Sequence, residues 1–443
     1  MLEANLKIIS ALKEFLFTVA NTPKHLNLFR NTEADFTRDR KLSFEKLALL
    51  IMRLCKKTLS VEIDKFFEEA KAGLPCSVAA FSLQRMKLKP FFFYSWNMAL
   101  WTSFYAEYGS KVKRWKGFRV LGCDGSNIAL VNKPDLQKYF GGQSNQSGSF
   151  VVAKTFYCYD VLNKIILFPQ IVPYRYGELN VAYDIIERGI IEEDMLLIFD
   201  RYFSNYKMAA LMQWKEKEIK YVIRVKDSLN FAKKFVHSKK QSAVIEIFPS
   251  YSSVDGLKEC GYIAQEDTPL RVRLIRVQLA SGKIEVLMTN LWQEEGYAAN
   301  EFKMLYSLRW GVESNIGFQK NILQLESLSG LTPISVMQDF YATMLVANLH
   351  FLLIKQAQKT MDTTRMNQKY PMQINNNKAF GKIKENLIPL FVSHDPAEIL
   401  KRLHSYFIRA PLPIRKDRSV PRIRKNHMTK SKYRTFTNFK PAY

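Results

Sequence analysis

The chain of 443 residues is 47% hydrophobic and 13% aromatic, and its 66 Lys and Arg against 41 Asp and Glu give a formal net charge of +25. The apolar fraction excludes a disordered polyelectrolyte, and the length indicates several structural units. So large a positive charge on a folded protein is typical of proteins that bind DNA or RNA, although a merely basic or ribosome-associated protein has a similar composition.

The first segment, residues 1–110, is predicted to be a helical domain. Apolar residues recur at helical spacing in 44–55 and 63–67, and a further helix is predicted over 78–88, with Ser77 as its N-cap. Two short helices joined by a turn that contains glycine resemble a helix-turn-helix, although most such pairs are only packing units. We expect the second helix to expose Ser82, Gln84, Arg85 and Lys87, and Arg85 and Lys87 are candidate DNA contacts.

Residues 111–226 have the pattern of a mixed sheet. Strands are predicted at 118–123, 127–131, 151–159 and 165–171, and the polar, glycine-rich stretch 141–149 is predicted to be a flexible loop. A helix near 178–188, a strand at 195–199, a helix at 204–214 and a strand at 221–225 follow. This order predicts an α/β fold, with helices on the faces of the sheet.

The remaining chain divides into three parts. Residues 227–288 contain strand-like runs at 243–248, 270–279 and 284–289 without a convincing long helix, which predicts a β-rich insertion. Residues 289–330 are predicted to return to the domain of residues 111–226, with one helix over about 297–329. Residues 331–443 are predicted to be helical, with helices over 333–355 and from Asp395-Pro396 onward. The basic tail 415–440 holds ten Lys or Arg and one acid.

Several common signals are missing from the sequence. The first twenty residues contain Glu3, Lys7, Lys13 and Glu14, which interrupt any signal-peptide core, and no uncharged apolar run reaches the length of a membrane helix. The five cysteines are scattered and form no C-x-x-C pair, which argues against a disulfide framework and against a zinc site. We therefore expect a cytoplasmic protein without a membrane partner.

Two acidic residues occupy positions where active sites form. Asp124 and Asp200 each follow an apolar strand, and the carboxyl ends of strands in an open sheet are where ligands gather. Either aspartate alone is weak evidence, because Asp often caps a helix or begins a turn after a strand.

A stripe of polar residues on the predicted 297–329 helix supplies the third acid. At 100° per residue, Tyr306, Arg309, Glu313 and Lys320 fall within a narrow arc, whereas Glu326 points away from them. A solvated face is the usual interpretation of such a stripe. Here the carboxylate suits a cation, the two basic residues suit a polyanion and the tyrosine suits base stacking. Asp124, Asp200 and Glu313 are therefore the predicted ligands of two Mg²⁺ ions, for which Mn²⁺ can substitute.

These residues resemble a known family. The spacing Tyr306-(2)-Arg309-(3)-Glu313-(6)-Lys320 matches the Y-(2)-R-(3)-E-(6)-K signature of bacterial insertion-sequence DDE transposases with an RNase H-like fold. The similarity extends to Asp-Gly-Ser at Asp124, to Asp200-Arg201, to residues 288–291, to N-terminal stretches at 36–46 and 80–82, and to residues 418–422.

The resemblance implies a cut-and-paste DNA transposase of a bacterial cytoplasm, associated with the nucleoid. Such an enzyme binds the terminal inverted repeats, nicks one strand, forms a hairpin on the flanking end, reopens it and joins the 3′ ends to target DNA. Its synaptic complex is a homodimer that cleaves in trans. By similarity, Asp124, Asp200 and Glu313 hold the metals, and Arg309 and Lys320 grip phosphates. Tyr306 contacts the displaced strand, and Arg201 is expected to contact DNA as well.

Two departures from the family and two alternatives stay open. Relatives have glycine after Asp-Arg, where this chain has Tyr202, and they place a base-holding tryptophan where alignment on Thr289 puts Glu285, with Trp292 further along. The alternatives are a plain metal-dependent nuclease and a catalytically silent, domesticated DNA-binding protein. Inverted repeats flanking the gene would separate a transposase from both.

Overall fold

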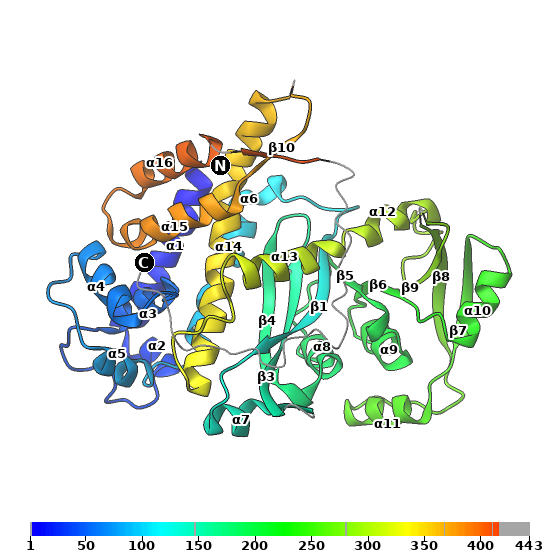
Figure 1. The fold of residues 1–443 in the computed structure, drawn as a ribbon. Coiled ribbons are helices and arrows are strands. Elements are labelled where there is room, and N and C mark those ends of the chain that lie inside the picture. Colours follow the sequence, from blue (N-terminus) through cyan, green and yellow to red (C-terminus); the bar gives the residue numbers. More distant parts are fainter. Residues whose placement is uncertain (1, 146–147, 280, 367, 410, 416–443) are drawn as a thin grey trace. The chain divides into compact units, whose positions relative to one another are not determined.

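A computed structural model describes residues 2–145, 148–279, 281–366, 368–409 and 411–415 (Figure 1). The chain forms two compact units, each built from separated stretches of sequence. One contains Met1–Lys111, Ile128–Ala153 and Gly317–Tyr443, and the other contains Val112–Asn127 and Lys154–Ile316. The domain limits that the sequence suggested, at 110, 226, 288 and 330, stay a prediction. The basic tail lies outside the described residues, apart from Arg415.

The sheet has the strand order expected of an RNase H-like fold. Strands β1 (Arg119–Ala129), β3 (Gly148–Asp160) and β4 (Ile165–Pro173) come first along the chain, and β5 (Met195–Phe199) and β6 (Lys220–Arg224) follow. In space, β4 pairs with β3, and the order continues through β1 and β5 to β6. The pairs β1–β5 and β5–β6 are parallel. The predicted RNase H-like mixed sheet is therefore confirmed.

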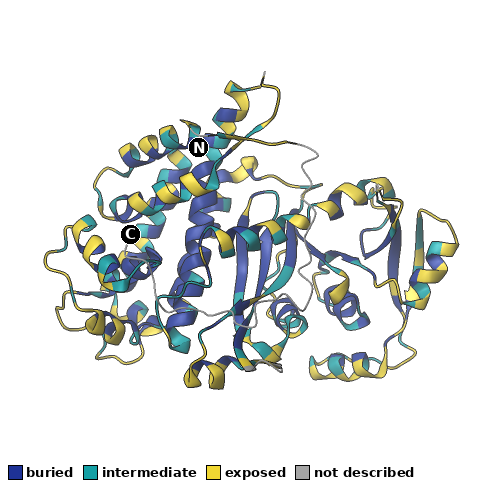
Figure 2. Ribbon diagram, in the orientation of Figure 1, coloured by how far each residue is buried: buried dark blue, intermediate teal, exposed yellow. Residues whose placement is uncertain are grey.

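The central strands form the core because nearly every side chain on them is apolar. All five residues of β5 are buried, which Figure 2 shows as an unbroken dark stretch. Such continuous burial is typical of a parallel strand covered on both faces. Helices α8 (Glu178–Glu187) and α9 (Tyr206–Gln213) follow β4 and β5 and pack against each other. Most predicted helices and strands of this region lie within a few residues of the observed ones, but the two strands predicted at 118–123 and 127–131 are the single strand β1.

The insertion extends the same sheet. Its strands are β7 (Ser242–Ile247), β8 (Leu270–Gln278) and β9 (Ile284–Thr289), and β9 pairs antiparallel with β6. β8 and then β7 continue the sheet, also antiparallel. Two short helices, α10 (Asn230–His237) and α11 (Tyr251–Glu259), lie between the strands in sequence. The β-rich character is confirmed, and pairing along β6 explains how the insertion attaches.

The single helix predicted over 297–329 is wrong. The chain instead forms η4 (Ala299–Glu301), α12 (Phe302–Ser307) and α13 (Trp310–Asn321), and no described residue from 322 to 332 is helical. At the break, backbone N–H groups reach three residues back, from Arg309 to Tyr306 and from Val312 to Arg309. Beyond α13, Leu323 and Leu325 are both buried. Between them, Gln324 has a positive φ of 50°, a left-handed conformation that cannot continue the helix.

The other unit is mostly helical. Its helices include α1 (Leu2–Asn21), α2 (Pro23–Phe29), α3 (Phe44–Met52), α4 (Leu59–Glu69), α5 (Val78–Arg85), α6 (Phe91–Tyr108), α7 (Pro134–Phe140), α14 (Pro333–Thr364), α15 (Asn376–Val392) and α16 (Pro396–Arg409). α14, which is longer than predicted, packs against α3, α6 and α16. The N-cap predicted at Ser77 is confirmed, since its side chain accepts a hydrogen bond from the Ala80 N–H. Asp395 likewise caps α16.

Two short pairs of strands complete this unit. β10 (Met372–Ile374) pairs with β11 (Pro411–Pro413), and β2 (Gly142–Asn145) pairs with the beginning of β3. The flexible loop predicted over 141–149 is therefore wrong. Gly142 lies so close to the neighbouring strand that a side chain there would collide with the carbonyl oxygen of Phe150. The glycine that suggested a loop is thus a requirement of close strand pairing.

Two predictions about covalent and membrane features can also be compared with the structure. None of the described helices combines the length and the apolar character that crossing a lipid bilayer requires. All five cysteines, each of which lies in a described segment, are free thiols, as the sequence pattern predicted.

Candidate active site

Asp124, within β1, and Asp200, directly after β5, lie at the same row of neighbouring strands. The parallel ladder between β1 and β5 ends with Cys123 opposite Phe199, and each aspartate is the next residue. Adjacent strands are about 4.8 Å apart, so this register brings the two carboxylates to one edge of the sheet. The sequence placed Asp124 at the end of its strand, which needs correction, because β1 continues to Ala129. Only its pairing with β5 ends at Cys123.

Asp200 also has a local structural role. Its Oδ1 accepts a hydrogen bond of 2.7 Å from the backbone N–H of Tyr202 and so caps the short helix η3 (Arg201–Phe203). Tyr202 is not among the residues with positive φ, so the turn does not need the glycine that the family usually has at this point. Its side chain and that of Arg201 are exposed next to Asp200. The departure from Asp-Arg-Gly is therefore compatible with an ordinary backbone.

Arg309 links Glu313 to Asp124. The Arg309 guanidinium lies 2.9 Å from Glu313 Oε1 and 3.9 Å from Asp124 Oδ2, and its side chain is almost completely buried. Because Arg309 lies at the break between α12 and α13, it precedes the first turn of the helix that carries Glu313. This guanidinium is a positive charge shared between two carboxylates that are distant in the sequence.

The electrostatics of Asp124 indicate that all three carboxylates are close to one another. The pKa of Asp124 is raised to about 7, mainly by burial and also by the negative charges of Asp200 and Glu313, whereas the Gly125 N–H and Arg309 oppose the shift. Carboxylates crowded in this way favour a cation among them. Their oxygen atoms are the ligands that Mg²⁺ and Mn²⁺ prefer, so the donor set fits the metals predicted from the sequence.

The side chains are nevertheless not arranged as a closed metal site. Among the described residues, no three His, Cys, Asp or Glu side chains converge closely enough to hold a single ion. The Arg309–Glu313 ion pair accounts for part of this arrangement, because it directs one oxygen of Glu313 toward the guanidinium. Coordination through Glu313 would therefore require this carboxylate to turn away from Arg309.

A fourth acid, which the sequence pattern does not single out, lies against Gly125, the residue after Asp124. A side chain at Gly125 would overlap the Glu178 carboxyl group and lie 2.8 Å from its Oε1. Glu178 begins α8 and accepts a hydrogen bond of 2.9 Å from Lys154. Nothing in the spacing of residues 125, 154 and 178 links them, since their proximity follows from the fold. The glycine of Asp-Gly-Ser was the only sequence signal of a close approach.

Tyr306 does not present the stacking surface that the stripe predicted. It is buried, belongs to the same core cluster as Val120, Leu196 and Phe302, and its ring lies 5.8 Å from the Arg309 guanidinium carbon. Burial raises the pKa of its phenol well above the usual range. In this structure Tyr306 therefore supports Arg309, and a base could stack on it only after the core opened.

Lys320 and Glu326 also differ from the helical-stripe prediction. Lys320 does lie on α13, but it belongs to the helical unit, where its Nζ is 4.0 Å from Glu326 Oε1. Glu326 is not on the helix at all, and its Oε1 accepts a hydrogen bond from the Ala129 N–H at the end of β1. The predicted angle between Glu313 and Glu326 therefore has no meaning, because the helix ends between them.

Arg85 is not available as a DNA contact, which corrects the prediction from the sequence. Its guanidinium is buried and bonds to Ser329, Ser335, Gln338 and Asp339. Gln84, predicted to be exposed, is buried as well, whereas Ser82 is exposed as expected. Lys87 is partly exposed and lies 3.8 Å from Asp35. The predicted base-reading face of α5 is therefore mostly a packing face.

The two insertion residues that the sequence left open are now located. Glu285, on β9, is buried and forms an ion pair of 2.8 Å with Arg224 at the end of β6. Trp292 follows β9, and the Arg271 guanidinium carbon lies 4.7 Å from its ring centroid. The structure thus places a charged pair where relatives have a tryptophan, and Trp292 already has a cationic partner from its own chain.

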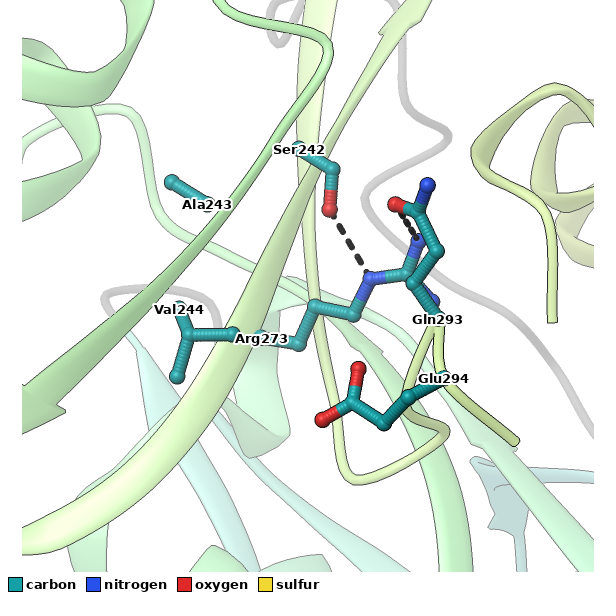
Figure 3. A pocket seen from close by; sticks show the side chains of 6 residues that line it. All are labelled: Ser242, Ala243, Val244, Arg273, Gln293 and Glu294. Atoms are coloured by element: carbon teal, nitrogen blue, oxygen red, sulfur yellow. Dashed lines mark hydrogen bonds between the residues drawn. The ribbon is translucent and has the colours of Figure 1, made fainter. Parts of the chain in front are cut away.

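A pocket of about 440 Å³ lies in the insertion and contains none of the predicted catalytic acids. Figure 3 shows Arg273 extending along it from β8, with Ser242 and Gln293 bonded to its guanidinium and Glu294 nearby. The carbonyl oxygens of Leu291 and Tyr297 accept the other N–H groups. Because its arginine is already bonded within the chain, this pocket is best explained as part of the insertion's own packing.

The fold and the acidic residues at the edge of its sheet define a protein of the RNase H-like class. More specifically, the chain belongs to the transposase DDE domain family, whose model matches residues 115–349, more than half of the protein. A comparison with curated proteins finds no match. Among solved structures, the chain is similar to a piggyBac transposase synaptic complex with hairpin DNA, with 11% identity and a TM-score of 0.42 over 94% of this chain and 88% of that one. This similarity is too low to transfer residue roles.

Proposed function

We propose that this protein is a cut-and-paste DNA transposase that cleaves transposon ends at Asp124, Asp200 and Glu313 and joins the freed 3′ ends to target DNA. The observation that carries the proposal is the in-register placement of Asp124 and Asp200, together with the Arg309 bridge from Asp124 to Glu313. Membership in the transposase DDE domain family supports the same reaction class.

The three carboxylates would hold two divalent cations, Mg²⁺ or Mn²⁺. Such ions, when bound, activate a hydroxyl nucleophile and stabilise the leaving oxygen of an in-line phosphoryl displacement. The chain's own contribution is to crowd negative charge at one sheet edge and to keep Arg309 beside it. Arg309, beside Asp124 and Glu313, would bond a phosphate oxygen near the scissile bond. Arg201, exposed beside Asp200, would bind the same strand.

The partners in this proposal are the terminal inverted repeats, target DNA and a second copy of the chain in a synaptic homodimer. The formal charge of +25 supports binding to DNA, and the free cysteines fit a bacterial cytoplasm where the enzyme acts on the nucleoid. A plain metal-dependent nuclease stays the main alternative, because it would use the same acids. Strand transfer of a cut end into a second duplex separates the two.

The proposal is tested by replacing each acid separately with its amide. Asp124→Asn, Asp200→Asn and Glu313→Gln should each reduce end cleavage to background, because an amide cannot supply a charged ligand to a divalent ion. DNA binding measured without metal should change little. Cleavage by the unaltered protein should require Mg²⁺ or Mn²⁺ and stop with chelator.

A matched control is Glu193→Gln, which removes an exposed carboxylate of the same unit whose single ion pair among the described residues is with Lys217. It should cleave normally. If all three amide variants lost DNA binding together with cleavage, the acids would be structural and the assignment would be wrong. A domesticated, catalytically silent protein would bind ends and show no cleavage under any metal condition.

A further inference from the structure

A segment of the insertion concentrates lysines that have no acidic partner. Residues 226–240 contain five lysines and a single acid, Asp227, which pairs with Lys283. All five lysines are exposed, and none forms an ion pair with any described residue. We call residues 226–240 the lysine segment. Its lysines are Lys226, Lys233, Lys234, Lys239 and Lys240.

Many other lysines of the same unit are neutralised within the chain. Each of six lies within 4 Å of a carboxylate oxygen: Lys116, Lys154, Lys215, Lys217, Lys220 and Lys283. The lysine segment therefore has an uncompensated positive charge, which costs repulsion energy unless a negatively charged partner binds.

The structure turns Lys233 and Lys234 of this segment to solvent. In α10, Ala232 and Phe235 are buried, so Lys233 and Lys234 between them are turned to solvent. The helix C-terminus is held by Arg276, which donates to the carbonyl oxygen of Val236. Basic residues often stabilise the C-terminal end of a helix, and this role would explain Lys234. It does not explain Lys226, which precedes the helix, or Lys240, which lies beyond it.

The lysine segment leaves the sheet at the edge where the catalytic acids lie. In the parallel ladder of β5 and β6, Phe199 is opposite Ile223, so Asp200 and Arg224 are the next residues of their strands. Lys226 follows Arg224 by two residues. Because neighbouring strands are about 4.8 Å apart, the segment begins within a few ångströms of the row that contains Asp200.

We propose that the lysine segment binds the sugar–phosphate backbone of duplex DNA that extends from the acidic centre across the insertion. This inference rests on the proposed function for the direction of the DNA, but the binding itself does not require cleavage. Lysine ammonium groups on a helix and the turn after it suit phosphates, which recur along both strands and carry no sequence information. The segment is therefore a positioning surface, not a reader of sequence.

The test is the triple variant Lys233→Gln/Lys234→Gln/Lys240→Gln in the full chain. Binding is measured without metal, over a range of salt concentrations, to a random-sequence duplex and to a duplex with the element's own end. We expect affinity for both to fall at least about tenfold at low salt, and the slope of log affinity against log salt to decrease by about 0.9 for each phosphate that the protein no longer binds. Circular dichroism should show an unchanged fold.

The matched control removes the same charge elsewhere. Lys7→Gln/Lys217→Gln/Lys382→Gln alters three exposed lysines that each pair with a carboxylate. Its salt slope should stay close to that of the unaltered protein. An equal effect of both triples would mean that only net charge matters, and no effect of the first would mean that the segment serves another partner, such as an acidic protein. Either result overturns the proposal, whereas normal cleavage by Asp124→Asn would refute the catalytic assignment alone.

Discussion

At the scale of single residues, Gly125 shows how the fold constrains the catalytic motif. Its missing side chain leaves the space that the Glu178 carboxylate occupies, and Lys154 holds that carboxylate at 2.9 Å. The Asp-Gly-Ser sequence is therefore more than a turn signal, since the glycine lies within β1 and has no positive φ. Asp124 precedes it directly, so any shift of the backbone at Gly125 would also move a predicted metal ligand.

The residue-scale prediction is that Gly125→Ala destabilises the protein by about 1–3 kcal/mol, because the added methyl group forces Glu178 away from Lys154. End cleavage should fall as well. Adding Glu178→Ala to Gly125→Ala should restore part of the stability, and thermal unfolding of the two single variants and the double variant measures this coupling. Gly381→Ala is the control, because no atom lies within 4 Å of the new methyl group inside α15, and it should be neutral or slightly stabilising. Additive effects of Gly125→Ala and Glu178→Ala would contradict the steric argument.

At the scale of elements, the sequence predicted strands better than the continuity of helices. β5 and β9 were predicted with their observed limits, because short apolar runs bounded by polar residues leave few alternatives. The break at Leu308 and Arg309 was missed, because the helical spacing of polar residues continues through it. Buried tertiary contacts determine where the backbone leaves the helical conformation. Asp124 and Asp200 were found because each follows an apolar run, and Glu313 was found from the polar stripe. Glu178 and the lysine segment were not selected, although five lysines in fifteen residues were visible in the sequence.

Helix α5 was predicted as a helix, but the face expected to be exposed is mostly buried. Its first residue and N-cap were predicted, although the helix ends at Arg85 and not at Leu88. Arg85 points into the unit, where Asp339 and Ser329 accept its N–H groups. Burial alone would raise the pKa of Asp339, but Arg85, Lys56 and the Ser329 hydrogen bonds hold it below its usual value. A sequence pattern cannot reveal this inversion, because the acid that pairs with Arg85 lies in α14.

The element-scale prediction is that Arg85→Ala destabilises the protein by about 3–5 kcal/mol at neutral pH, because Asp339 becomes a buried charge without its arginine. In the unaltered protein the pKa of Asp339 is lowered, so the stability from this group is present at neutral pH and is lost as pH falls through that value. In the variant the pKa should rise, so the destabilisation should shrink in mild acid, where Asp339 binds a proton. Urea unfolding at several pH values measures this.

The control for Arg85→Ala is Lys87→Ala. Lys87 is partly exposed and lies 3.8 Å from Asp35, so its removal should cost less than about 1 kcal/mol at any pH. A small effect of Arg85→Ala on stability, together with a large loss of sequence-specific DNA binding, would restore the DNA-contact role that the sequence suggested.

At the scale of the whole molecule, some basic residues form ion pairs within the chain and others do not. Arg53, Arg85 and Arg119 are buried in ion pairs and hold the fold together. The lysine segment contributes charge without any such partner among the described side chains. The basic tail 415–440, apart from Arg415, lies outside the described residues, so its proposed role rests on ten Lys or Arg and a single acid.

The last prediction concerns that tail. Deleting residues 416–443 should weaken binding to every DNA duplex and lower the salt slope by about 0.9 for each phosphate that is released, because backbone binding depends on displaced counterions. Discrimination between an end sequence and random DNA should survive at matched salt, since phosphate contacts position a protein but do not specify bases. If the tail and the lysine segment hold separate phosphates, combining the deletion with Lys233→Gln/Lys234→Gln/Lys240→Gln should add the two changes in slope. A combined change no larger than either alone would mean that both bind the same phosphates, and loss of discrimination on truncation would assign sequence reading to the tail.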